Sequence, residues 1–228
     1  MHLCFMLNTV AMAMIVYASL ALSNDFDILT KSSFNKIVLG NDVTKGSIDG
    51  AVIHLGLRSL AVSKSDVGDV VIGYDQLCDL EGADLLLDSE DCAACSDMSL
   101  NLVISTILAA ILILPSILGN VTRMYSGYDV NCQKCFSGIL SLLSLGLCVN
   151  TLVCYHWLCA KTFHQAASEF DGSAVTYEWT FGWAMILMIA ASCIKGLEIL
   201  INCCVPTPSI TRNRKEQITY ECIKEIDE

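Results

Sequence analysis

The residues that could do chemistry begin with three cysteines in an acidic stretch. Cys78, Cys92 and Cys95 lie within residues 24–97, a segment with fourteen acidic and five basic side chains. Cys92 and Cys95 form a C-x-x-C pair, which suits redox chemistry or metal binding. A zinc ion needs four ligands, however, and the other nearby candidates are Cys78, His54 and carboxylates. A structural disulfide is favoured if this segment meets an oxidising compartment. We therefore expect these three cysteines to form disulfides.

A second set of cysteines flanks two apolar stretches further along the chain: Cys132, Cys135, Cys203 and Cys204. If the fold brings them together, four thiolates could bind zinc. Cysteines at the ends of membrane spans are also typical sites of reversible palmitoylation. We favour acylation, so no metal site is expected here.

The acidic run of residues 84–91 could attract cations. Its carboxylates are Asp84, Asp88, Glu90 and Asp91. Calcium prefers several oxygen ligands, but the run lacks the spacing and the glycine of an EF-hand loop. A solvated acidic surface is favoured. An intermediate interpretation is that these side chains raise the local concentration of cations near a pore or junction.

Lys195 and Glu198 are ionisable residues inside the last apolar stretch. Three positions apart, they share one helix face. Ionisable residues within a span are functional candidates by default, although a lysine near a helix end can reach the interface. A structural pair or interface anchor is favoured over a transport site. The sequence shows no convincing catalytic constellation or phosphate loop, so we expect no enzyme activity and no cofactor.

Four apolar stretches must position these residues. They cover residues 3–22, 99–119, 136–159 and 177–204. Each can cross a bilayer, because a helix needs about 20 apolar residues to do so. Charged residues make up 16% of the chain, against about 25% in soluble domains. The first stretch could instead be a signal peptide, but it lacks a preceding basic residue and exceeds the usual apolar core, so a retained helix is favoured.

The segments between the spans predict the topology. Residues 24–97 contain three expected strands, 35–40, 47–57 and 69–77, because each is rich in Val and Ile and bounded by turn residues. The short loop 120–135 is net positive, whereas 160–176 has one basic and two acidic residues. The positive-inside rule then places loop 120–135, the tail 205–228 and both termini in the cytoplasm. The acidic outer segment argues against nucleic acid as a partner.

This pattern resembles the claudin, peripheral myelin protein and stargazin superfamily of tetraspan proteins. The resemblance rests on Gly182–Ala184 (GWA), on Cys203–Pro206 (CC-x-P), and on Trp157 with Phe163 and Phe170 beyond it. It implies an all-α membrane four-helix bundle with a small extracellular antiparallel β-sheet. It also implies a plasma-membrane location, with the lipid bilayer as one partner.

The chain departs from the family pattern in its first outer loop. The family has G-L-W followed by two cysteines, whereas this chain has Gly56-Leu57-Arg58, and its cysteines come later. Cys78 could pair with Cys92 or Cys95, closing a loop of about 15 residues worth about 3 kcal/mol. One cysteine is then left over unless a residue at a helix end, such as Cys159, joins it.

Two functions are expected from these features. One is a structural and adhesive role at cell contacts, in which the protein associates with itself or with other tetraspans and shapes cation permeability. Pairing of edge strands would be the physical means. The other is an auxiliary subunit of a channel or receptor, which the missing tryptophan and the Lys195–Glu198 pair favour. A transporter is less well supported, because few polar residues line the spans.

Overall fold

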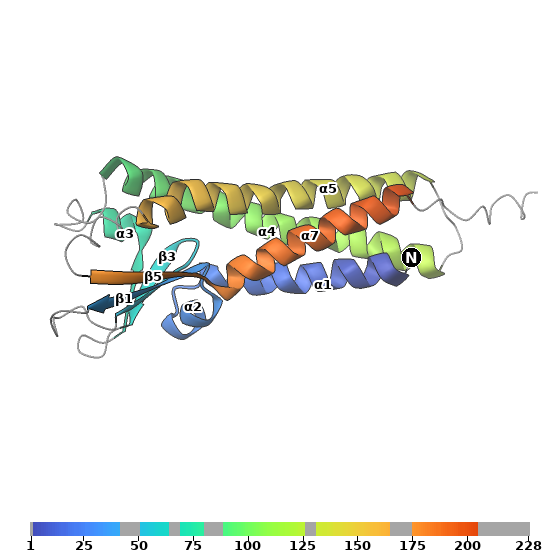
Figure 1. Ribbon diagram of the computed structural model, residues 1–228. Coiled ribbons are helices and arrows are strands. Elements are labelled where there is room, and N and C mark those ends of the chain that lie inside the picture. Colours follow the sequence, from blue (N-terminus) through green and yellow to red (C-terminus); the bar gives the residue numbers. More distant parts are fainter. Residues whose placement is uncertain are drawn as a thin grey trace, which may run out of the picture.

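Four long helices lie side by side, with a small sheet at one end (Figure 1). The computed structural model describes residues 2–41, 51–63, 69–79, 89–125, 131–164 and 175–204. The helices are α1 (His2–Ser19), α4 (Ser89–Tyr125), α5 (Asn131–Cys154) and α7 (Trp183–Cys204); η1 (Leu20–Leu22) follows α1, and the π-helical η3 (Tyr155–Ala160) extends α5. All four are long and apolar enough to cross a membrane. The chain therefore has the architecture of a multi-pass membrane protein.

The bundle forms because each helix buries one narrow stripe of residues. In α1 the buried residues are Cys4, Asn8, Ala11, Ile15 and Ala18. In α4 they include Leu102, Thr106, Ala109, Ile113, Ser116 and Asn120. Alternating steps of three and four residues keep such a stripe facing the neighbouring helices. Alanines within the stripes allow the helix backbones to approach closely.

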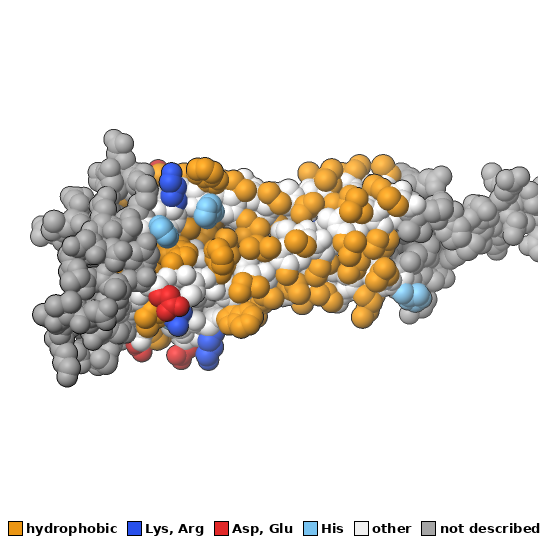
Figure 2. Space-filling model, viewed as in Figure 1, with side chains coloured by type: hydrophobic (Ala, Val, Ile, Leu, Met, Phe, Trp, Pro, Cys, Tyr) orange, Lys and Arg blue, Asp and Glu red, His pale blue; other side chains and the backbone are white. Residues whose placement is uncertain are grey.

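The outer faces of the same helices are apolar. Large side chains that remain exposed include Leu3, Ile107, Ile111, Leu142, Val153, Ile186 and Leu200. Figure 2 shows hydrophobic side chains along the whole shaft, whereas the charged side chains gather at the sheet end. A monomeric soluble protein rarely exposes so large an apolar surface. The shaft is thus suited to contact with lipid.

The sheet has five antiparallel strands in the order β4-β3-β2-β1-β5. They are β1 (Asn35–Asn41), β2 (Val52–Leu55), β3 (Ser59–Ser63), β4 (Val70–Gly73) and β5 (Val175–Phe181). Ile37, Leu55 and Leu60 share one face through the strand register and are buried in the core. The sheet and two short helices, α2 (Phe26–Ser32) and α3 (Tyr74–Cys78), make up the part of the protein beyond the bundle, which we call the outer module. This architecture is consistent with a claudin-like fold.

The strands differ from the predictions in several places. The predicted strand 35–40 corresponds to β1; within 47–57 the structure describes a strand at 52–55, and residues 47–50 lie outside the described residues. Within 69–77 the strand ends at Gly73, and α3 follows. The strand β3, Ser59–Ser63, was not predicted. Its sequence, SLAVS, does not alternate between apolar and polar residues, so it lacks the usual pattern of a strand.

Helix boundaries also differ, most of all at the starts of the fourth and the second helix. The fourth helix was predicted from residue 177, but residues 175–181 form β5 and α7 begins at Trp183. The prediction counted residues 177–181 as part of an apolar span, although the alternating aromatic residues Tyr177, Trp179 and Phe181 favour a strand. The second helix begins at Ser89, ten residues before its predicted start. Its first turns are acidic, so hydropathy alone marks only the apolar part.

Gly182 joins β5 to α7 at a very close approach to β1. A Cβ at this position would lie 2.0 Å from the carbonyl oxygen of Ser33. The backbone N–H of Gly182 donates to Phe34 O at 2.7 Å, and that of Ala184 donates to Ser33 O at 3.2 Å. The start of α7 is therefore fixed to the start of β1 by backbone contacts.

Gly182→Ala should destabilise the protein, because the methyl group would meet backbone that cannot rotate away. Overpacking of this kind costs about 1–3 kcal/mol. Gly196→Ala is the matched control, since a Cβ there meets nothing within 4 Å. Thermal unfolding of the purified protein in mild detergent should show a lower Tm for Gly182→Ala alone. Equal Tm values for the two variants would contradict the close contact.

Candidate functional site

Polar side chains from all four helices meet inside the bundle, near the end opposite the sheet, which we call the tail end. We define the polar network as Asn8 of α1, Ser116 of α4, Ser137 and Ser141 of α5, and Lys195 and Glu198 of α7. Each of these residues is at most 2% exposed. No other described part of the bundle core contains a charged side chain.

Lys195 and Glu198 form an ion pair at the centre of the polar network. Lys195 Nζ lies 2.6 Å from Glu198 Oε2. The same ammonium group donates to Asn8 Oδ1 and, at 3.1 Å, to Ser141 Oγ. A lysine has three N–H donors, so its hydrogen-bonding capacity is used. Because Lys195 points into the bundle, it does not serve as an interface anchor.

The Glu198 carboxylate is equally well surrounded. It accepts a hydrogen bond from Asn8 Nδ2 at 2.7 Å and from Ser141 Oγ at 3.1 and 3.2 Å. Asn202 Nδ2 adds a longer contact of 3.4 Å. Ser116 links Asn8 to α5, because its Oγ lies 3.2 Å from Asn8 Nδ2 and 3.3 Å from Ser141 Oγ. A buried ion pair is tolerable only with such additional hydrogen bonds.

One disulfide joins the sheet end of the protein to the bundle, and a second joins two helices of the bundle near the sheet. Cys78 of α3 is joined to Cys92 of α4, with S–S 2.07 Å. Cys95 of α4 is joined to Cys159 of η3, with S–S 2.06 Å. The three predicted cysteines are therefore all disulfide-bonded, and the residue at a helix end that takes the fourth place is Cys159. Both bridges start from the first turns of α4.

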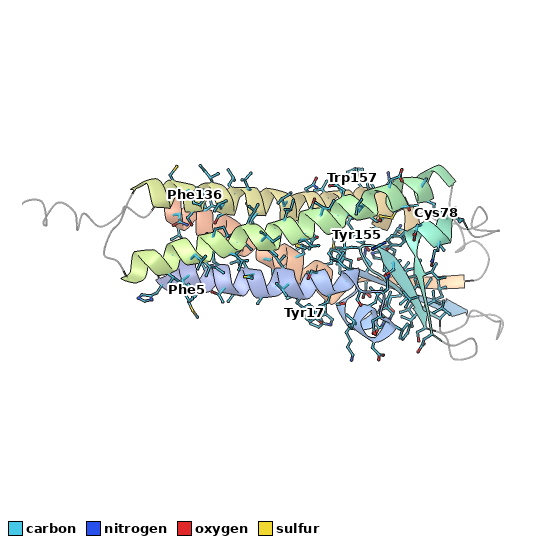
Figure 3. All side chains as sticks on the ribbon, turned by 180° about the vertical axis from the view of Figure 1, so that it is seen from behind. Phe5, Tyr17, Cys78, Phe136, Tyr155 and Trp157 are labelled. Carbon is cyan, nitrogen blue, oxygen red and sulfur yellow. A yellow bond between two sulfur atoms is a disulfide. The ribbon has the colours of Figure 1, made fainter. Side chains whose placement is uncertain are left out.

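Aromatic residues fill the junction between sheet and bundle (Figure 3). The Tyr155 ring lies 4.9 Å from that of Phe34, and its hydroxyl accepts from Asn35 Nδ2 at 3.2 Å. The Tyr74 hydroxyl donates to the Gly56 carbonyl oxygen at 2.8 Å. Burial raises the pKa of Tyr74 above the ordinary value for tyrosine. These contacts fix the start of β1 against η3, and α3 against the turn that follows β2.

The Gly56-Leu57-Arg58 segment, where the resembling family has G-L-W, turns between β2 and β3. A Cβ on Gly56 would lie 2.6 Å from Ala21 O, and Leu57 N donates to the same oxygen at 3.1 Å. Leu57 is fully buried, whereas Arg58 is exposed. Gly56 and Leu57 therefore hold the sheet against η1, directly after α1, whereas Arg58 is exposed to solvent.

His54 on β2 is the titratable group of the sheet with a clearly perturbed environment. Partial burial, followed by the charge of Lys36 opposite it on β1, lowers the pKa of His54. Ser33 Oγ lies 3.4 Å from His54 Nδ1. The folded state therefore favours the neutral imidazole more than the unfolded chain does.

Acidification should weaken the outer module through His54. The unfolded chain binds a proton near pH 6.5, whereas the folded state resists it, so this contribution to stability is present above about pH 6.5 and is lost as the pH falls. We expect Tm to fall between pH 7 and pH 5. His54→Gln should remove the part of this pH dependence of Tm that His54 causes, and Lys36→Gln should reduce that part. An unchanged pH profile in His54→Gln would show that other groups control it.

Exposed aromatic side chains mark both ends of the shaft. Trp157 and Trp183 are 61% and 65% exposed near the sheet, and Phe136 is 57% exposed towards the tail end. Figure 3 shows Trp157 and Tyr17 at the sheet end and Phe5 and Phe136 at the other. Such belts are typical of membrane–water interfaces. Aromatic residues at both ends of the shaft fit helices that each cross the bilayer once.

The remaining predicted site residues are only partly described. Cys135, Cys203 and Cys204 are exposed thiols at the tail end, as acylation requires, whereas the side chain of Cys132 lies outside the described residues. Asp84 and Asp88 also lie outside them. Glu90 and Asp91 fall in the first turn of α4, but their side chains are not described. Among the described residues there is no group of three or more potential metal ligands.

Sequence reasoning missed the polar partners of the ion pair. Asn8, Ser116 and Ser141 come from three different spans, more than 50 residues from Lys195 along the chain. A signal was present, since each is a polar residue on the buried stripe of its helix. Neither a family model nor a curated protein matches the chain.

Proposed function

We propose that this is a non-enzymatic, claudin-like tetraspan membrane protein that presents a rigid β-sheet outside the cell and makes structural, adhesive contacts through it. The observation that carries the proposal is the attachment of the sheet to the bundle. Attachment occurs through Gly182, through Gly56, and through the disulfide Cys78–Cys92. The disulfide Cys95–Cys159 holds η3 to α4, and Tyr155 of η3 packs on Phe34 beside the start of β1. A binding surface held this rigidly loses little conformational entropy on binding.

The contact would use the edge strand β4. Tyr74 N donates to Arg58 O, one position beyond the Ser59–Gly73 pair. Ladder hydrogen bonds recur at every second residue of an antiparallel pair. Ile72 and Val70 therefore bond to β3, and the backbone N–H of Val71 faces outward from the described sheet. An exposed edge of this kind can accept a strand from another molecule.

The alternative function is that of an auxiliary subunit of a channel or receptor. The Lys195–Glu198 pair was one argument for it, because intramembrane charges often serve a partner. In the structure both charges are satisfied within the chain's own bundle. That argument no longer supports a helix-to-helix partner, so the adhesive role is favoured.

Val71→Pro tests the adhesive proposal. Proline removes the outward N–H and is tolerated on edge strands, whereas Val71→Ala retains the N–H. Cells expressing the full chain should aggregate with one another, and Val71→Pro should lower aggregation roughly tenfold relative to Val71→Ala, the loss expected from one or two hydrogen bonds. Equal aggregation by both variants would contradict contact through β4.

A pull-down in mild detergent separates the two functions. If the tagged protein recovers itself or other tetraspans, this supports adhesion and self-assembly. If it recovers a channel or receptor subunit in stoichiometric amount, the auxiliary role replaces the adhesive one. The cytoplasmic placement of the termini, the acylation of Cys135, Cys203 and Cys204, and an effect on cation permeability remain parts of the proposal.

A further inference from the structure

The bundle core changes character along its length. One helical turn beyond the polar network towards the tail end, three inward positions are again occupied by polar or thiol side chains: Cys4, Asn120 and Asn202. In the opposite direction the buried stripes are mostly apolar, with Ala11, Ile15, Ala109, Ile113, Cys148 and Met188. The hydroxyls buried there, of Thr106, Ser144 and Thr151, donate to backbone carbonyl oxygens of the helices. A polar third of the core thus lies at the tail end, closed off from the sheet by apolar layers.

Asn120 stands out within this polar third. It is fully buried, and neither Nδ2 nor Oδ1 has a hydrogen-bond partner. A carboxamide offers two donors and an acceptor with two lone pairs. It lies one turn from Ser116 on α4, and the Ser116 hydroxyl belongs to the polar network.

Burial also excludes another use of this residue. Asn120-Val121-Thr122 is a glycosylation sequon, but a side chain with no exposed surface leaves no room for a glycan in the folded protein. The unpartnered amide is therefore not explained by modification. Buried polar groups without protein partners are normally satisfied by ordered water, which makes two to four hydrogen bonds in such sites.

We propose that the tail-end third of the bundle binds water at Asn120, in a hydrated site that is continuous with the Lys195–Glu198 network and open only towards the tail end. The ligand class is water itself, or a small hydrated cation able to replace it. The apolar layers around Ile15 and Met188 prevent the hydrated site from becoming a channel. This hydrated site is a property beyond the proposed adhesive function and does not depend on that function.

Silver-ion accessibility tests this proposal. A cysteine is placed at Ser116, which faces the core, or at Leu118, which is 64% exposed towards lipid and lies closer to the tail end on the same helix. All cysteines except the four in disulfides are replaced by alanine. The full chain is reconstituted in vesicles, and Ag⁺ modification is measured as loss of later maleimide labelling.

If the site is hydrated, Ag⁺ added on the tail side should modify Ser116→Cys at least tenfold faster than Leu118→Cys, although Leu118 lies at a shallower depth. Modification of Ser116→Cys no faster than that of Leu118→Cys, or only from the sheet side, would overturn the proposal.

Asn120→Leu, added to Ser116→Cys, tests the role of the amide. It keeps the side-chain size and removes the groups that bind water, so Ag⁺ modification should slow several-fold. Asn120→Ala serves as a second variant. Gel filtration and the intact Cys95–Cys159 disulfide report whether each variant is folded. An unchanged rate in a folded variant would overturn the assignment of the water to Asn120.

Discussion

Glu198→Gln, with Lys195 left in place, should lower the stability of the bundle by about 3–5 kcal/mol, the usual cost of removing one partner from a buried ion pair. The ammonium group lies 2.6 Å from Glu198 Oε2 and is fully buried. Without the carboxylate it becomes an uncompensated charge inside a membrane bundle. The remaining contacts to Asn8 and Ser141 are neutral and replace only part of the interaction.

The double variant Lys195→Met/Glu198→Leu separates the cost of an unpaired charge from the value of the pair. Replacing a whole buried pair by apolar residues is often neutral or even stabilising. We therefore expect the double variant to unfold at a higher temperature than Glu198→Gln. Leu197→Ala, on the lipid-facing side of the same helix, is the control.

Thermal unfolding in detergent, followed by size-exclusion chromatography, provides the measurement for all of these variants. If Glu198→Gln and Leu197→Ala lose stability equally, the buried ion pair does not control the bundle. A double variant less stable than Glu198→Gln would instead show that the pair makes a net favourable contribution beyond charge neutralisation.

Removal of the Cys95–Cys159 disulfide should have the second large effect. The two cysteines are 64 residues apart, against 14 for Cys78 and Cys92. The entropy of loop closure grows with the number of residues in the loop. The chain-entropy account of disulfides therefore gives a stabilisation of about 4 kcal/mol for the longer loop and about 3 kcal/mol for the shorter one. Replacing Cys95 and Cys159 together by alanine should therefore loosen the outer module more than replacing Cys78 and Cys92.

Hydrogen exchange of the outer module would measure this difference. Loss of Cys95–Cys159 frees η3, and with it Tyr155, which packs on Phe34 and accepts from Asn35. Exchange in β1 should accelerate in the Cys95/Cys159 variant and change less in the Cys78/Cys92 variant. The reverse order would show that α3, rather than η3, holds the sheet in place.

The four spans could be predicted because lipid imposes a length of about 20 apolar residues on every crossing helix. The sheet was harder to predict, since β5 pairs with β1 across more than 130 residues of chain. The alternating aromatic residues of Val175–Phe181 fit a strand, but they directly precede an apolar span, where aromatic residues are equally typical of a membrane interface. The start of α4 was missed because a helix held by disulfides need not be apolar.

The candidate site, too, could be predicted only in part. Lys195 and Glu198 are conspicuous because charges are rare in spans. Cys78, Cys92 and Cys95 are conspicuous because they lie in the outer segment. Their partners depend on which residues meet in three dimensions. The sequence left Cys159 as an option for the fourth cysteine, and it did not link the polar residues Asn8 and Ser116 to the ion pair.

The single-residue joint at Gly182 has a mechanical consequence. Because β5 passes into α7 without a loop, and because Gly182 and Ala184 are hydrogen-bonded to the start of β1, a pull on the sheet is carried directly into α7. That helix bears both charges of the ion pair, whose partners sit on α1 and α5. Tension applied outside the membrane would thus be resisted on its far side, by hydrogen bonds that hold α7 in register with its neighbours.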